Sequence, residues 1–328
     1  MTIVGLDVGY SNLKLAVGAP GAPPRVLVRP AGAAPLARLG ERLAAGAGSE
    51  AAVRVEVAGT PWAAAIEPVR FEGWQRALHE DYTASPAFRA LVQAALVLVG
   101  EARIARLVTG LPVAQAQEPR RREALRRALL GGHDTPPGRV VVAEVHIVPQ
   151  PVGAFVDLLC SGADAELLAR LEEGTVLVLD AGYYSVDWAL IVAGELRRGA
   201  SGTSLEAMSV LIERAATRLA ETHGGRAQPL ALEAALRRGR THLAVFGARV
   251  ALAPLLEAAA GEVAAVALEA LRQALRREVS NVDLVLLAGG GAALYAPGAR
   301  SAFPHAEVRL APEPVAANAR GFFHYGAH

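Results

Sequence analysis

An acidic residue, a short glycine-containing turn and a lysine follow one another near the start of the sequence. Asp7 follows an apolar run that begins at Thr2, and the turn from Val8 to Asn12 leads into a second run of alternating apolar residues. Backbone N–H groups in such a turn can bind phosphate oxygens, and a carboxylate beside them can hold a divalent cation through water. Lys14 is the only lysine in the sequence and would add a compact positive charge. An ordinary N-terminal hairpin with a solvated lysine is the alternative interpretation.

A second copy of this pattern lies in the other half of the sequence, between Thr175 and Ile191. The segment Leu179-Asp180-Ala181-Gly182-Tyr183 repeats Leu6-Asp7-Val8-Gly9-Tyr10. We place Ser185 at the position of Ser11, with one extra residue in the second turn. Two matching strand–loop–strand units predict a duplicated domain with a ligand cleft between the copies.

Two further segments place candidate ligand groups at the ends of predicted strands. The strand predicted from Val140 to Val148 leads to Gln150, and Pro151 then opens a helix, so the Gln150 amide would lie at the carboxyl edge of a sheet. A polar helix cap is an equally open interpretation. The strand predicted from Val282 to Leu287 runs into three glycines, which would let a flat or anionic ligand approach the backbone near a helix N-terminus. Simple flexibility of that turn is the alternative.

The elements that position these residues alternate between strands and helices, which predicts an α/β fold. Ser85 and Pro86 have the cap and first-position chemistry of a helix that runs to Val99. The region from Gly18 to Thr83 reads as a small inserted subdomain of short strands. The remaining predicted elements are strands at 25–29, 51–57, 104–108 and 242–246, and helices at 118–130, 151–159, 202–221, 229–238, 250–277 and 312–323.

Composition excludes several classes of protein. The 328 residues are 52% hydrophobic and only 5% aromatic, which suits alanine-rich helices packed on sheets. A formal charge of +1 argues against direct nucleic-acid binding, and we interpret the arginine-rich helix at 118–130 as a solvated face. Cys160 is the single cysteine, Met1 leads straight into a predicted strand, and no apolar run is long enough to span a membrane. We therefore expect a cytoplasmic protein that does not enter membranes.

Five motifs, in this order, resemble those of the actin-like ATPase superfamily. They are the first phosphate loop (7–14), the first connecting segment (148–154), the second phosphate loop (180–187), the adenosine segment (288–293) and the second connecting segment (313–321). Within the superfamily, D-V-G-Y-S-N-L-K and the compact length are most similar to the ParM/StbA-type plasmid-segregation actins, including protein D of PRTRC plasmid systems.

The resemblance implies two ribonuclease-H-like domains, each a mixed sheet with flanking helices, and a nucleotide cleft between them. The first would span 1–160 with the C-terminal helix 313–328 and a small subdomain at about 18–83, and the second would span 161–312. ATP or ADP would bind with Mg²⁺, which Asp7 and Asp180 would hold largely through water. The remaining residues implied to contact the nucleotide are Gly9, Tyr10, Ser11, Asn12, Lys14, Gly182, Tyr183, Ser185, Asp187, Glu206, Gly289, Gly290 and Gly291.

Gln150 matches the superfamily position that orients the attacking water. An amide can position water but cannot accept its proton, so we expect slow hydrolysis of ATP. The resemblance implies nucleotide-dependent filaments for plasmid or DNA segregation, with DNA reached through a DNA-binding adaptor. A metabolic kinase or phosphatase of the same superfamily, and an actin-like scaffold that does not hydrolyse nucleotide, are the alternatives.

Overall fold

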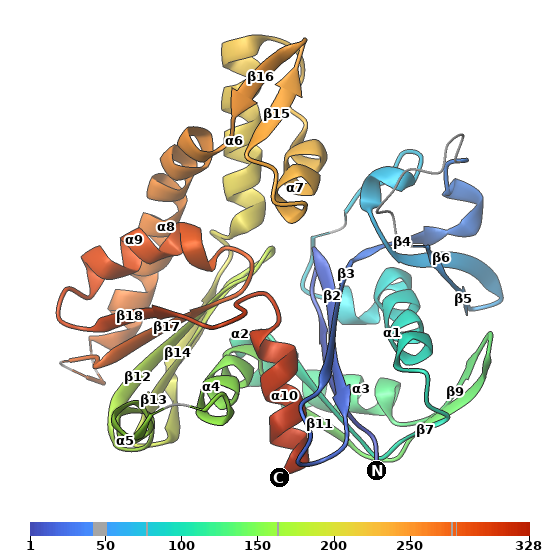
Figure 1. Cartoon of the computed structure of the whole chain (residues 1–328), viewed down its shortest axis with the longest axis horizontal. Helices are drawn as coiled ribbons and strands as arrows, with labels where there is room; N and C mark the ends of the chain where they lie inside the picture. Colours follow the sequence, from blue (N-terminus) through green and yellow to red (C-terminus); the bar gives the residue numbers. More distant parts are fainter. Residues whose placement is uncertain (42–50, 77, 163, 277, 280) are drawn as a thin grey trace. The chain divides into compact units, whose positions relative to one another are not determined.

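The chain divides into two units, which are described separately. Unit 1 contains residues 1–111, 118–149 and 318–328, and unit 2 contains residues 112–117 and 150–317 (Figure 1). The computed structural model describes residues 1–41, 51–76, 78–162, 164–276, 278–279 and 281–328. Residues 42–50 and 77 of the predicted small subdomain, and Arg277 at the end of a predicted helix, lie outside the described residues.

Unit 1 is built on a five-stranded mixed sheet with the strand order β11-β8-β1-β2-β3. Its strands are β1 (Ile3–Val8), β2 (Asn12–Gly18), β3 (Arg25–Pro30), β8 (Arg106–Leu111) and β11 (Val145–Pro149). β1 is antiparallel to β2 and parallel to β8. Two smaller sheets have the orders β4-β6-β5 and β7-β10-β9. Their strands are β4 (Gly32–Pro35), β5 (Val53–Val57), β6 (Thr60–Ile66), β7 (Arg103–Ile104), β9 (Gly131–Thr135) and β10 (Gly138–Val142).

Helices cover both faces of the main sheet of unit 1. α10 (Ala317–Ala327) lies on one side of β1 and β2, and α1 (Pro86–Val99) lies on the other (Figure 1). Gly5 allows the contact with α10, because a Cβ there would lie 2.0 Å from the carbonyl oxygen of Ala319. The predicted start of α1 is confirmed, since the Ser85 hydroxyl accepts a hydrogen bond from the Phe88 N–H at 3.1 Å. The unit also contains α3 (Pro119–Leu129) and the short helices η1 (Leu36–Arg38), η2 (Pro68–Arg70) and η3 (Tyr82–Ala84).

Unit 2 repeats this plan with the strand order β14-β13-β12-β17-β18. Its strands are β12 (Thr175–Ala181), β13 (Val186–Val192), β14 (Glu195–Ser204), β17 (Leu284–Ala288) and β18 (Glu307–Leu310). β12 is antiparallel to β13 and parallel to β17, as β1 is to β2 and β8. The two sheets therefore have the same topology, with the two hairpins at equivalent positions.

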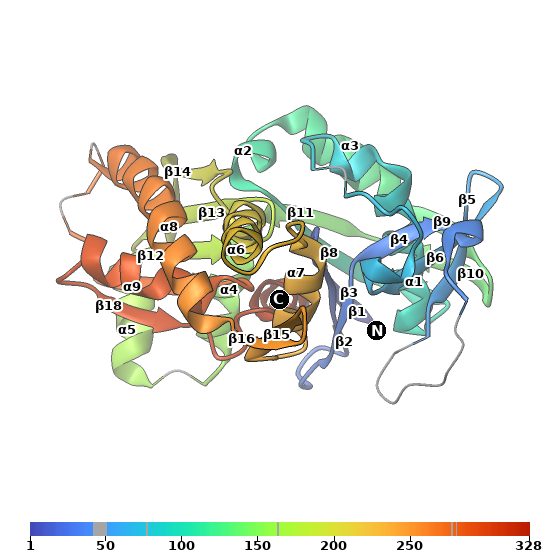
Figure 2. The same cartoon turned by 90° about the horizontal axis from the view of Figure 1, so that it is seen from above.

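The alternation of buried residues in β12 sets the two layers of unit 2. Leu177, Leu179 and Ala181 face a core formed with α6 (Met208–His223), α8 (Ala253–Leu275) and α9 (Ala292–Ala302). Val176 and Val178 face α4 (Gln150–Cys160) and α5 (Ala165–Glu173) on the other side. α8 and α9 lie side by side (Figure 2). The unit also contains α2 (Val113–Ala116), α7 (Pro229–Arg237) and the hairpin of β15 (His242–Val245) and β16 (Ala248–Ala251).

Five predicted elements need correction. The strand predicted at 104–108 covers parts of β7 and β8, and the strand predicted at 140–148 covers β10 and β11; in both cases the two strands belong to different sheets. The helix predicted from Gly202 starts at Met208, because the preceding residues complete β14, and its cap position is Ala207 rather than Ser or Thr. The helix predicted from Val250 starts at Ala253 because Val250 pairs with Leu243 in the β15–β16 hairpin. The last helix starts at Ala317 instead of Pro312. In each case, a strand pairing or a turn that the local residue pattern does not show sets the boundary of the element.

Each unit is a mixed sheet with helices on both faces, as predicted. No helix among the described residues is both long enough and apolar enough to cross a bilayer.

Candidate functional site

The hairpin of β1 and β2 places a buried acid beside the lysine. Asp7 and Lys14 are directly opposite each other in the register of the two strands. Lys14 Nζ lies 2.8 Å from Asp7 Oδ2, and the Asp7 side chain is 2% exposed. The ammonium therefore compensates the charge of a carboxylate that is nearly out of water, and the contact fixes where Lys14 points.

The turn of this hairpin contains a buried amide oxygen, that of Asn12, with no partner in the part of the chain that the structure describes. The Gly9 N–H donates to the Asn12 carbonyl oxygen at 3.0 Å and closes the turn. A Cβ at Gly9 would lie 3.1 Å from both that oxygen and Lys14 Nζ, so a side chain there would crowd the turn and the lysine. Asn12 Oδ1 is buried without a hydrogen-bond partner among the described residues. An unsatisfied buried oxygen is the group expected of a site that completes its hydrogen bonds with a ligand or water.

The hairpin of β12 and β13 has the same geometry. The Gly182 N–H donates to the Ser185 carbonyl oxygen at 3.0 Å, as Gly9 does to Asn12. Ala181 pairs with Val186, and Val8 pairs with Leu13. The two turns are therefore equal in length, and the predicted extra residue is wrong. Ser185 stands at the position of Asn12, and Tyr184 stands at that of Ser11.

Asp180, the equivalent of Asp7, is 6% exposed at the end of β12. It shares the α4 side of the sheet with Val176 and Val178, because successive strand residues alternate between faces. Its neighbour on β17 is Ala288, and the glycines that follow pack onto it. A Cβ at Gly289 would lie 2.4 Å from Asp180 Oδ1, and the φ of Gly289 is +83°. The close approach and the backbone conformation both require glycine.

Asp187, the register partner of Asp180, is 1% exposed and hydrogen bonded through both oxygens. Its Oδ2 accepts from the Ser185 hydroxyl at 2.6 Å. Its Oδ1 accepts from the Thr203 hydroxyl at 2.6 Å and from the Val113 N–H at 2.7 Å. Burial raises the pKa of Asp187, although the three hydrogen bonds oppose that shift. This carboxylate ties β13, β14 and the start of α2 together.

The second hairpin, the glycine turn and the start of α6 converge within unit 2. The Gly291 N–H donates to the Ala181 carbonyl oxygen at 2.9 Å, and the Met208 N–H donates to that of Gly182 at 3.3 Å. A Cβ at Gly291 would lie 2.8 Å from Met208 Cγ. The second hairpin, the glycine turn and the start of α6 were identified from separate sequence patterns. In the structure they therefore form one surface.

Glu206 lies in the same region, at the turn from β14 to α6. Its carbonyl oxygen accepts a hydrogen bond from the Tyr295 hydroxyl of α9 at 2.6 Å. Its Oε2 is buried with no hydrogen-bond partner in the described part of the chain. Burial and the nearby charge of Glu206 raise the pKa of Tyr295, so its hydroxyl stays a donor. Glu206 is thus fixed by its backbone and retains an unsatisfied side-chain oxygen.

Gln150 is the first residue of α4 and is half-buried. α4 packs on β12 and β13, on the face that Asp180 shares. Among the described residues, no three His, Cys, Asp or Glu side chains form a cluster that could hold a metal ion by themselves.

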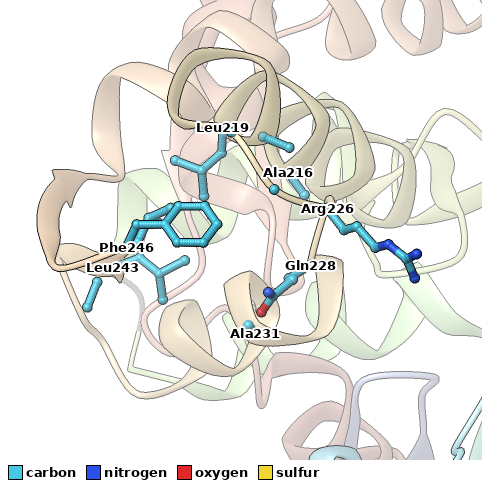
Figure 3. A pocket seen from close by; sticks show the side chains of 12 residues that line it. Ala216, Leu219, Arg226, Gln228, Ala231, Leu243 and Phe246 are labelled. Carbon is cyan, nitrogen blue, oxygen red and sulfur yellow. The ribbon is translucent and has the colours of Figure 1, made fainter.

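A cavity of about 150 Å³ lies elsewhere in unit 2, between the end of α6, α7 and the β15–β16 hairpin (Figure 3). Its apolar wall includes Leu219, Leu243 and Phe246, and Arg226 and Gln228 stand at its edge. None of the predicted site residues lines it.

Comparisons with known proteins agree with the duplicated topology. Residues 5–153 match the family described as actin like proteins N terminal domain. Among solved structures, the archaeal actin homolog Ta0583 in complex with ADP aligns over 99% of both chains, with 21% identity and a TM-score of 0.77. The chain has an actin-like fold. The predicted resemblance to actin-like proteins is thereby confirmed.

Two ParM structures are also similar to this actin-like chain. A 15-stranded ParM filament from Clostridium botulinum aligns over 99% of this chain and 98% of its own, with 15% identity and a TM-score of 0.76. Apo psk41 ParM aligns over 99% and 96%, with 15% identity and a TM-score of 0.65. No curated protein sequence matches the chain.

The structure also shows groups that hydrogen bond to the predicted site residues and that the sequence did not predict. Thr203 and the Val113 N–H hold Asp187, and Tyr295 holds Glu206. None of them lies in a recognisable motif, because a hydroxyl at the end of a strand or a backbone N–H after Pro112 is common in any fold. Their roles come from tertiary contacts alone.

Proposed function

We propose that this actin-like protein binds ATP or ADP with Mg²⁺, hydrolyses ATP slowly and forms nucleotide-dependent filaments for plasmid or DNA segregation. The observation that supports this most directly is the pair of equivalent hairpins, each with a buried acid at the same position, in sheets of the same topology. The Ta0583 structure with ADP and the ParM filament structure are the similar proteins that point the same way.

The residues present suit a nucleotide and its metal ion. Asn12 Oδ1 and Glu206 Oε2 are buried and lack partners among the described residues, so a ligand could complete their hydrogen bonds directly or through water. Gly290 has no atom within 4 Å of the position that a Cβ would take, so its backbone is open to a ligand. Asp7 and Asp180 are hard oxygen ligands, and Mg²⁺ is usually bound by one or two carboxylates, phosphates and water. The bound ion would neutralise phosphate charge as the bond to the terminal phosphate breaks.

Each half of the proposed site has its own task. In the first hairpin, Lys14 and the backbone N–H groups of Tyr10 to Asn12 would bind phosphate oxygens, while the Gly9 N–H closes the turn. In the second hairpin, the backbone N–H of Ser185 would bind phosphate; Gly182 closes that turn, and Asp187 accepts from the Ser185 hydroxyl and so holds the residue in place. Gly289 to Gly291 and Glu206 would contact the adenosine part. For Tyr10 and Tyr183 we propose backbone contacts with the phosphates.

Gln150 would position the attacking water. Its amide oxygen can accept a hydrogen bond from that water but cannot take its proton, so hydrolysis would depend on preorganised donors and would be slow. A slow reaction suits a timer: subunits would add with ATP and leave after hydrolysis. DNA would be reached through a DNA-binding adaptor, in the cytoplasm.

The decisive experiment measures ATP binding by calorimetry, single-turnover phosphate release with ATP and Mg²⁺, and pelleting of assembled protein. We expect wild type to release phosphate slowly and to pellet only with nucleotide. Gln150→Ala should bind ATP but lose release, and Asp180→Ala should lose both. Asp134→Ala is the matched control, because this exposed aspartate of β9 should leave both unchanged. Wild type that does not bind ATP would overturn the proposal.

The same experiment separates the alternatives. Filaments that form with ATP but release no phosphate would identify a non-hydrolysing scaffold. Phosphate that appears on a sugar or acetate instead of in solution would identify a kinase.

A further inference from the structure

Tyr10, in the turn of the first hairpin, is held by a segment far away in the sequence. Its ring stacks on that of Tyr82, with centroids 4.0 Å apart and an interplanar angle of 21°. Its hydroxyl donates to the carbonyl oxygen of His79 at 2.5 Å. The side chain of Tyr10 therefore points toward the η3 segment of unit 1, where both its ring and its hydroxyl make contacts.

Tyr82 is itself anchored in the unit. Its ring meets that of Phe88 edge to face at 5.4 Å, and Phe88 is 6% exposed in the first turns of α1. Desolvation, with a smaller contribution from Tyr10, raises the pKa of Tyr82, so the stack stays uncharged. The pair connects the turn of the hairpin to the core beneath α1.

The turn that accepts the Tyr10 hydrogen bond is also bound to α3. Arg121 of α3 donates to the carbonyl oxygen of Glu80 and to Asp81 Oδ1, both at 3.1 Å. Its Nε donates to Glu118 Oε2 at 2.9 Å, which orients the guanidinium. A continuous set of contacts thus runs from the hairpin turn through residues 79–82 to α3.

The second hairpin is anchored differently. The Ser209 N–H of α6 donates to the carbonyl oxygen of Tyr183 at 2.8 Å, so a helix start holds that turn. In unit 1, β3 is followed by β4 instead of a helix, and the Ala31 N–H between them donates to the Ser11 carbonyl oxygen at 2.9 Å. The aromatic pair adds a side-chain anchor on Tyr10 to this backbone contact.

We propose that Tyr10 and Tyr82 form an aromatic clamp that sets the conformation of the first hairpin's turn and couples it to α3. Tyr10 is a positioning residue: it fixes where the N–H groups of Tyr10 to Asn12 point before phosphate arrives. Preorganised donors bind more tightly because no ordering has to occur on binding. The inference rests on the proposed function, since phosphate is the ligand that the turn is set to receive.

The first test is calorimetric titration of ATP with Mg²⁺ into four proteins. Tyr10→Ala should weaken binding about tenfold, or 1.4 kcal/mol, because the stack and the hydrogen bond are both lost. Tyr82→Ala should match it, and the double variant should be no weaker than either single one, since they disrupt one contact. Tyr10→Phe keeps the stack and should lose less than threefold. Tyr325→Ala, an exposed tyrosine on α10, is the control and should stay within twofold.

The second test is hydrogen exchange of the backbone amides with and without ATP. If Tyr10 only stabilised the fold, its removal would not change the effect of ATP on this exchange. ATP should slow the exchange of residues 79–85 and of the first turn of α3 in wild type. In Tyr10→Ala saturated with ATP, that slowing should disappear. Arg121→Ala, a change at the surface, should lose the slowing in α3 and keep ATP affinity within threefold.

The outcomes separate this inference from the proposed function. If wild type binds ATP and the Tyr10→Ala and Tyr82→Ala variants bind it as tightly as wild type, the clamp alone is overturned. Losses of affinity that add in the double variant would also overturn the clamp alone. Unchanged slowing at 79–85 in Tyr10→Ala would overturn the coupling to α3. Wild type without ATP affinity would overturn the proposed function and the clamp with it. If the alanine variants of the two tyrosines fail to fold, Tyr10→Leu and Tyr82→Leu, which remove the stack but keep a large apolar side chain, carry the same comparisons with the same outcomes.

Discussion

Replacing Asp187 should separate the hydrogen-bonding role of this buried side chain from its charge. The carboxylate accepts from two hydroxyls and from the Val113 N–H while only 1% exposed. Asp187→Ala removes all three acceptor contacts. The hydroxyls of Ser185 and Thr203 can rotate, but the N–H of Val113 cannot, so at least one buried donor is left unsatisfied.

The size of each effect follows from these contacts. The unsatisfied Val113 N–H costs about 1–3 kcal/mol, and the two lost hydrogen bonds from the hydroxyls add about 1 kcal/mol each, so Asp187→Ala should lower the free energy of unfolding by about 3–5 kcal/mol. Asp187→Asn has the same shape. Its Oδ1 can still accept from Val113 and Thr203, and its Nδ2 can donate to Ser185 once that hydroxyl turns. We expect a loss of about 1 kcal/mol or less.

The pH dependence has a definite sign. Asp has an ordinary pKa of about 3.9, and burial raises the pKa of Asp187 in the folded protein. Between those two values the folded state binds more protons than the unfolded state. The contribution of Asp187 to the free energy of unfolding is therefore greatest at low pH and falls as pH rises from about 4 through the raised pKa. Asp187→Asn lacks that fall, so it should gain stability relative to wild type over the same range.

Urea denaturation of wild type, Asp187→Ala and Asp187→Asn, at pH 4 and pH 8, measures all three quantities. The expected result is an alanine variant at least about 2 kcal/mol less stable than the asparagine variant. An alanine variant within about 1 kcal/mol of wild type, or an asparagine variant as unstable as alanine, would refute the reasoning.

Two other changes test the glycine turn and the ion pair. Gly289→Ala puts a Cβ 2.4 Å from Asp180 Oδ1 at a φ of +83°, so it should destabilise the protein by about 2–4 kcal/mol in the same urea assay. Gly290→Ala is the control: no atom lies within 4 Å of its Cβ position, so its stability should stay within about 0.5 kcal/mol of wild type. Lys14→Met removes the cation 2.8 Å from the buried Asp7 carboxylate and should cost about 3 kcal/mol; adding Asp7→Asn should restore stability but not ATP affinity, as urea denaturation and calorimetry would show.

The two hairpins were predictable because each depends on local chemistry. An apolar strand, an acid, a glycine turn and an alternating strand occur within sixteen or so residues, and that pattern fixes a hairpin without further information. The start of α1 was predictable for the same reason, since Ser85 and Pro86 act on the adjacent turn. The five motifs in order then indicated the actin-like fold.

The split of 140–148 was not predictable from local pattern. Ala143 and Glu144 separate β10 from β11, yet neither is a strong strand breaker. The division arises because β10 pairs with β7 and β9, while β11 pairs with β8. Pairing partners distant in sequence decide such boundaries. The same applies to Asp187, whose partners on β14 and α2 have no signature in the sequence.

The two hairpins share one scaffold but place different chemistry on it. Opposite the first acid stands Lys14, whereas opposite the second stands Asp187. In the proposed site, a cation in both hairpins would compensate both acids and reduce their attraction for a metal ion. With Lys14 in one hairpin and Asp187 in the other, the first hairpin would supply positive charge to the ligand, whereas the additional carboxylate of the second accepts hydrogen bonds within unit 2. The two turns have the same backbone pairing, and the difference at one register position gives the first hairpin a charge and the second a hydrogen-bond acceptor.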